Sequence, residues 1–118
     1  MIKKTEKPWG YELLFALTNS YAGKVIKINA GHRLSYQYHE IKEETIYIHE
    51  GEMKLVVEKN GKKKEKILKK GDNYHIPPKL KHRMEALEDC IIFEVSTPHL
   101  NDVIRLENDY GRINKKQG

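Results

Sequence analysis

Apolar and polar residues alternate over short stretches of the chain, and Gly, Pro and Asn turns separate these stretches. Alternation with a period of two is typical of strands that bury one face. The pattern predicts eight or nine strands, at residues 11–17, 23–29, 33–39, 45–49, 53–59, 63–68, 72–76, 82–86 and 90–96. Strands this short and this closely spaced favour an all-β, jelly-roll barrel with little helix, because closure removes exposed sheet edges.

The length of 118 residues predicts one domain over residues 1–118 with a single core. The segment after Pro98 changes character, since residues 101–106 carry only a little apolar content. We expect this segment to pack on the barrel, and the polar residues 113–118 to fray.

Cys90 is the one cysteine of the chain and lies in an apolar run. A single cysteine forms no intramolecular disulfide, and we expect a buried, inert thiol. The first residues lack the apolar core of a signal peptide, and no apolar run is long enough to span a bilayer. We therefore expect a cytoplasmic protein without a membrane partner.

The net charge of +5 is concentrated in a lysine cluster at residues 62–70. The cluster follows Asn60-Gly61, a strong hairpin signal, and its lysines alternate with Glu65 and Ile67. This pattern favours a solvated edge strand, which lysines protect from pairing. Since no aromatic platform is interleaved with the lysines, we expect no nucleic-acid partner, although a basic field draws in small phosphorylated substrates.

Four polar side chains have the spacing of a metal site. Gln37 and His39 are two residues apart and share a face of one strand, and a bend at residues 40–43 brings Glu44 beside them on the neighbouring strand. His82, just past the Pro77-Pro78 turn, supplies a fourth group. Two imidazoles, a carboxylate and an amide oxygen suit zinc, manganese, iron or nickel, and the lack of thiols argues against a structural zinc clip.

Two stretches carry a resemblance to a known family. The spacing from Gly31 through Gln37, His39 and Glu44 to Gly51 resembles the first motif of the cupin superfamily, with Gln37 where the general pattern has a histidine. The stretch at residues 71–82 resembles the second cupin motif, with a lysine at position 79 where a glycine is usual.

Three further stretches resemble one branch, the type II mannose-6-phosphate isomerases. They are residues 34–39, which resemble the metal strand of that branch, residues 7–12, which resemble its Pro-Trp-Gly segment, and residues 102–112, which resemble its closing segment. Lys42 stands where the branch has an arginine, so the charge is kept without the bidentate fork.

The resemblance implies a metal-dependent isomerase that interconverts an aldose and a ketose phosphate, with mannose 6-phosphate and fructose 6-phosphate as the first candidates. Gln37, His39, Glu44 and His82 would bind one divalent ion, with zinc as the first expectation and manganese, iron or nickel as alternatives. Such an ion stabilises an enediolate, while a nearby base moves the proton.

The base and the phosphate ligands are open at this stage. Glu94 is the first candidate for the proton shuttle, and Tyr47 and Lys42 are the alternatives. Arg105 and Arg112 are candidates for phosphate binding through the resemblance. Lys42 joins them by its position, and Tyr47 is a candidate for stacking on the sugar.

Two other functions remain open. One is a metal-bearing module that binds a sugar or another ligand without catalysis, and the other is an iron-dependent oxygenase, which rests on fold analogy alone. We also expect a homodimer, in which the strand at residues 11–17 crosses to the neighbouring copy.

Overall fold

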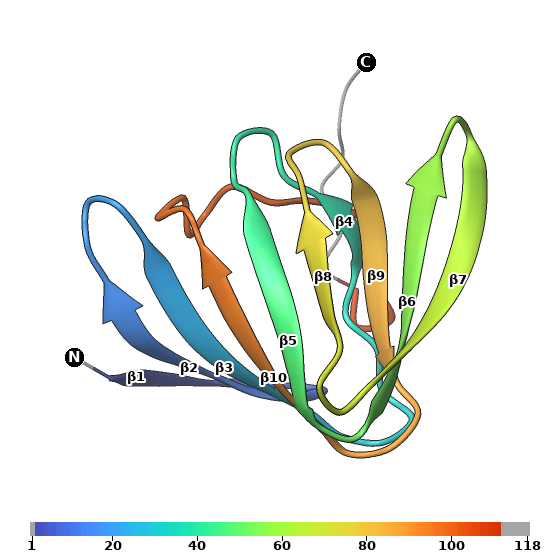
Figure 1. Cartoon of the computed structure of the whole chain (residues 1–118), viewed down its shortest axis with the longest axis horizontal. Helices are drawn as coiled ribbons and strands as arrows, with labels where there is room; N and C mark the ends of the chain where they lie inside the picture. Colours follow the sequence, from blue (N-terminus) through green and yellow to red (C-terminus); the bar gives the residue numbers. More distant parts are fainter. Residues whose placement is uncertain (1, 112–118) are drawn as a thin grey trace.

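The computed structural model describes residues 2–111 and consists of two β-sheets that face each other (Figure 1). No helix occurs in this part of the chain, and none is therefore long and apolar enough to cross a membrane. The strands are Lys3–Lys7 (β1), Gly10–Leu17 (β2), Ala22–Ile28 (β3), Tyr36–Tyr38 (β4), Glu44–Glu50 (β5), Glu52–Lys59 (β6), Lys62–Lys69 (β7), Asn73–Ile76 (β8), Lys81–Ala86 (β9), Cys90–Ser96 (β10) and Ile104–Glu107 (β11).

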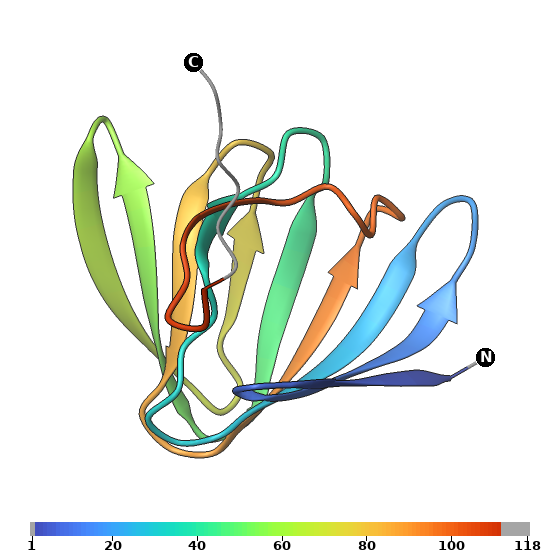
Figure 2. The same ribbon diagram turned by 180° about the vertical axis from the view of Figure 1, so that it is seen from behind.

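The strand order is β1-β2-β3-β10-β5-β8 in the six-stranded sheet and β11-β4-β9-β6-β7 in the five-stranded sheet. All neighbouring strands are antiparallel, and the chain passes repeatedly between the sheets. The prediction of an all-β jelly roll is confirmed. Figure 2 shows the segment after β10 running across the open end of the sandwich and then down beside β4.

The predicted strand at 33–39 is shorter than expected. Only Tyr36–Tyr38 forms β4, while Arg33 makes an isolated bridge to Glu85. The chain before β4 follows β9 through single backbone hydrogen bonds, such as Leu34 N–H to the Met84 carbonyl. Two strands, β1 and β11, were not predicted, because β1 contains no apolar residue and the alternation of β11 covers only four residues.

The core lies between the inner faces of the two sheets. Alternate residues of the six-stranded sheet point inward and are almost completely buried, as at Ile26, Ile46 and Ile92. They meet Met53 and Leu55 of the five-stranded sheet in one cluster. The same alternation continues to one end of the sheet, where the inward positions are charged, and this places ionisable side chains inside the sandwich.

Two predictions made for the periphery and one made for the core are confirmed. Asn60 and Gly61 have φ values of 54° and 74°, which are the left-handed values that a two-residue hairpin turn requires. The lysine cluster lies on β7, an exposed edge strand. Cys90 is fully buried, as expected.

Candidate metal centre

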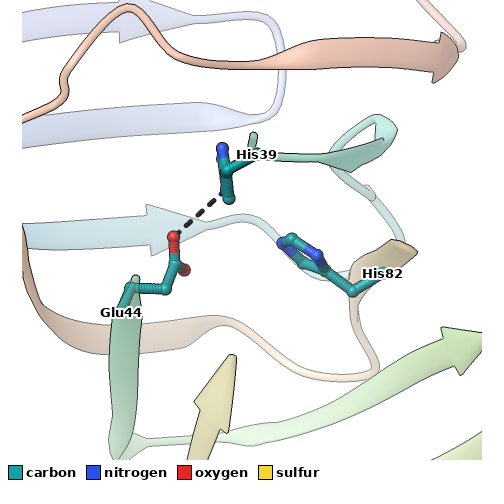
Figure 3. Close-up of side chains that lie close together, drawn as sticks. All are labelled: His39, Glu44 and His82. Carbon is teal, nitrogen blue, oxygen red and sulfur yellow. Dashed lines mark ion pairs between the residues drawn. The ribbon is translucent and has the colours of Figure 1, made fainter. Parts of the chain in front are cut away.

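Three side chains converge at the open end of the sandwich (Figure 3). His39 follows β4, Glu44 begins β5 and His82 lies on β9. One ligand atom from each residue lies within 4.8 Å of the others. His39 Nε2 is 3.2 Å from Glu44 Oε1, and none of the three residues is more than 3% exposed. A compact, buried set of two imidazoles and one carboxylate is typical of a divalent metal site.

The three residues come from both sheets. β4 pairs with β9 and β11, whereas β5 pairs with β8 and β10. The prediction that Glu44 lies on the strand next to Gln37 and His39 is therefore wrong. Residues 40–43 instead carry the chain from one sheet to the other, and the ligand atoms meet across the space between the sheets.

Backbone carbonyls orient both imidazoles. His39 Nδ1 is 2.6 Å from the Asp102 carbonyl oxygen, and His82 Nδ1 is 2.8 Å from that of Leu80. Because a carbonyl oxygen only accepts, each Nδ1 donates, and the lone pair of each neutral ring is on Nε2. Both Nε2 atoms are buried and have no hydrogen-bond partner among residues 2–111.

This arrangement fits a metal ion. A buried nitrogen without a hydrogen-bond partner is costly, and a neutral His39 ring would place the Nε2 lone pair against a carboxylate oxygen at 3.2 Å. A cation placed between the two nitrogens and the Glu44 carboxylate would satisfy all three groups. A metal-bound histidine that donates its other nitrogen to a carbonyl is also the usual second-sphere arrangement.

Gln37 lies beside these residues. Its Cα atom is paired with that of His82 across β4 and β9, and its side chain lines the same cavity. The amide oxygen accepts a hydrogen bond from the Ser35 hydroxyl. Since an amide oxygen has two lone pairs, this contact leaves one for a metal.

Lys42 connects Glu44 with the candidate proton shuttle, Glu94. Its Nζ is 3.2 Å from Glu44 Oε1 and 3.0 Å from Glu94 Oε2, and all three side chains are buried. Burial disfavours the Lys42 ammonium, but the two carboxylates outweigh burial and raise the pKa of Lys42. Burial also opposes ionisation of Glu44, yet its contacts with His39 and Lys42 lower the pKa of Glu44 to about 2. For Glu94, burial and the charge of Glu44 raise the pKa.

Asp102 holds the loop that carries these residues, and the sequence analysis assigned it no role. Its carboxylate accepts hydrogen bonds from the backbone N–H groups of Glu40, Ile41 and Lys42, at 3.1, 2.7 and 2.8 Å. Its carbonyl orients His39, as described above. The only signal in the sequence was the resemblance of residues 102–112 to a closing segment.

The site opens into a cavity of about 370 Å³ between the sheets. Gln37, His39, Lys42, Glu44 and Glu94 all line this cavity. The polar residues that line the rest of its wall include Lys3, Lys7, Glu12, Lys24, Asn101, Arg105 and Asn108.

The structure separates the predicted substrate-binding residues. Arg105 lines the cavity, whereas Arg112 lies outside the described residues. Tyr47 is 43% exposed and stacks on Phe93 on the outer face of the six-stranded sheet, so its position contradicts both predicted roles, substrate binding and proton transfer. The reason is parity, because residues 44, 46 and 48 of β5 point inward and Tyr47 points outward.

Solved structures with a similar fold include oxalate decarboxylase from Bacillus subtilis, with a TM-score of 0.80 and 17% identity over 89% of this chain and 30% of that one. CapF, a capsular polysaccharide assembling protein from Staphylococcus aureus, has a TM-score of 0.79 and 17% identity, over 91% of this chain and 32% of CapF. KdgF from Halomonas sp. has a TM-score of 0.70 and 22% identity, over 82% of this chain and 86% of KdgF. The chain thus spans about a third of the length of the first two proteins.

One related structure concerns the Mn(II) centres of the Bacillus subtilis oxalate decarboxylase. A comparison with curated protein sequences gave no match. The cupin domain matches residues 24–96, which is more than half of the sequence and includes His39, Glu44, His82 and Glu94. With the two-sheet sandwich, this match shows that the chain belongs to the cupin domain family.

Proposed function

We propose that the protein is a metal-dependent isomerase that interconverts an aldose and a ketose phosphate, with mannose 6-phosphate and fructose 6-phosphate as the first candidates. One observation carries the proposal: His39 and Glu44 of the metal-type triad line one cavity together with a buried Lys42–Glu94 ion pair. A triad alone accounts for metal binding. The adjoining carboxylate adds a group that can move a proton.

His39, Glu44 and His82, with Gln37 as the fourth ligand, would hold the metal. The mixed nitrogen and oxygen donors suit zinc, our first expectation, as well as manganese, iron and nickel. The Mn(II) centres of the structurally similar oxalate decarboxylase support the inclusion of manganese. When bound, such an ion polarises a carbonyl group and stabilises the negative charge that grows on its oxygen.

Glu94 is assigned the proton transfer between carbons. Its carboxylate removes the proton from the hydroxyl-bearing carbon next to the carbonyl and returns it to the former carbonyl carbon. The proton of that hydroxyl moves to the former carbonyl oxygen, so no proton is gained or lost overall. Lys42 orients this carboxylate through the 3.0 Å ion pair. Its ammonium group can also donate to the sugar oxygens on which charge develops.

Arg105 is our candidate for the phosphate end of the substrate among the residues predicted from the sequence. It lies on β11 and lines the same cavity as His39 and Glu44. The corresponding role of Arg112 stays a prediction.

Turnover of mannose 6-phosphate tests the proposal. Protein stripped of metal and reloaded with zinc, manganese, iron or nickel should form fructose 6-phosphate, followed by ³¹P NMR, and a chelator should stop the reaction. Glu94→Gln should lower kcat by about 10²- to 10⁴-fold, the usual contribution of a general base, with metal content unchanged. Glu65→Gln on the exposed strand β7 is the matched control.

Absence of turnover with every metal, over a panel of aldose and ketose phosphates, would overturn the isomerase. It would favour a cupin that binds a sugar without catalysis. One observation supports that second candidate: the Lys42 ammonium already forms ion pairs with both Glu44 and Glu94 in the structure. The iron-dependent oxygenase stays a prediction that these residues do not favour over the other two.

A further inference from the structure

Side chains of alternating charge continue from the triad across the inner face of the six-stranded sheet. Glu94 on β10 is paired in register with Lys24 on β3, beyond the Lys42–Glu94 ion pair. Lys24 Nζ lies 3.3 Å from Glu12 Oε1, and Lys7 Nζ lies 3.7 Å from Glu12 Oε2. The row therefore runs from the metal end of the sheet to its edge strand, β1.

Lysines outnumber carboxylates among the described residues that line this end of the cavity. Lys7 and Lys24 both contact Glu12, and Lys3 lies in the same cross-sheet row as Lys24. The side chains of Lys7 and Lys24 are only 18% and 14% exposed. Partly buried cations attract an anion more strongly than surface cations do, because water screens them less.

We propose that Lys7, Glu12 and Lys24 form an anion subsite, which holds the charged group of a small ligand whose other end reaches the metal triad. The two lysines would bind the anion, and Glu12 would fix their positions. The inference rests on the proposed function, since it adds Lys7 and Lys24 to Arg105, which lines the same cavity, as ligands for the phosphate of that substrate. A carboxylate on a sugar has the same recognition chemistry. A cavity of about 370 Å³ is of the size that holds a small-molecule ligand.

Lys24→Met tests the subsite without the need for turnover. Titration calorimetry on the zinc-loaded protein would compare mannose 6-phosphate, glucuronate and uncharged mannose as ligands. We expect Lys24→Met to weaken mannose 6-phosphate binding by about tenfold or more, the loss of one charge-assisted contact. Binding of mannose should not change. Lys24→Arg, which keeps the charge, should retain most of the affinity.

Lys64→Met on β7 is the matched control, because it removes the same charge from an exposed strand away from the cavity. Equal affinities of Lys24→Met and Lys64→Met for both anions would overturn the subsite, as would failure of the wild type to bind either anion. If Lys24→Met loses affinity for glucuronate alone, the subsite is supported and its ligand is a carboxylate. Binding that depends on Lys24 without turnover would support the subsite while the isomerase fails. Should Lys24→Met not fold, Lys7→Met makes the same comparison.

Discussion

Replacing His82 with leucine will remove tight binding of a divalent metal. The change deletes one of the two buried Nε2 atoms that have no hydrogen-bond partner in the described structure, and leucine offers no ligand atom. We expect the affinity for zinc to fall by more than about 100-fold, since changes outside the ligand shell already cost 10- to 100-fold. Zinc titrated into the metal-free protein, with calorimetry and metal analysis after dialysis, measures the loss.

Thermal unfolding gives a second measurement of the same change. A metal that binds only the folded wild type raises its Tm. The free energy of unfolding increases by about 2.7 kcal/mol when the metal concentration is 100 times Kd. The His82→Leu variant should show almost no such rise. His49→Leu is the matched control, because His49 is exposed on the outer face and stacks on Phe93. Equal zinc affinities of the two variants would contradict the metal centre.

The sequence predicted the residues of the triad but not how they meet. Gln37 and His39 are two residues apart, and a bend separates them from Glu44, so their spacing alone identifies a candidate site. Which strands pair is a long-range property. β10 pairs with β5 and β3, and this places Glu44 in the sheet opposite β4. Alternation along one strand carries no information on its partners.

The alternation of side chains along β5 already excludes Tyr47 from the cavity that Glu44 lines. Glu44 and Tyr47 lie three residues apart on β5 and must point to opposite faces, so both cannot line one cavity. Glu94 needed the register as well as the parity. Its place beside the metal site follows from its contact with the Lys42 ammonium and its register with Lys24, and neither can be predicted from alternation along β10.

Strand β1 escaped prediction for a physical reason. Its inward residues, Lys3, Thr5 and Lys7, line a polar cavity rather than the apolar core. Hydrophobic alternation detects strands that bury apolar side chains, whereas β1 has no apolar residue and is mostly exposed. The charged residues that leave β1 without an apolar pattern are also the residues that line the proposed anion subsite.

Replacing Asp102 with asparagine will weaken metal binding although Asp102 is not itself a metal-ligand candidate. Three backbone N–H groups of the 40–42 loop converge on its two carboxylate oxygens. An amide supplies one oxygen and places an NH₂ group against at least one of these donors. The loop would then lose the anchor that positions His39 and Lys42. We expect zinc affinity to fall by about 10- to 100-fold, as for other changes that disturb ligand orientation.

A general loss of stability must be separated from this positioning role. Asp109→Asn is the matched control, because the Asp109 carboxylate also anchors the C-terminal segment, through Arg33 at 2.7 and 2.9 Å, without touching the ligand loop. We expect Asp109→Asn to cost about 1 kcal/mol of unfolding free energy or less, the usual value of an exposed ion pair, and to leave zinc affinity unchanged. Asp102→Asn should lower zinc affinity even where the metal-free protein is fully folded. If both variants bind zinc as the wild type does, the carboxylate of Asp102 anchors the chain end alone, and the His39 ring is held by the backbone carbonyl without it.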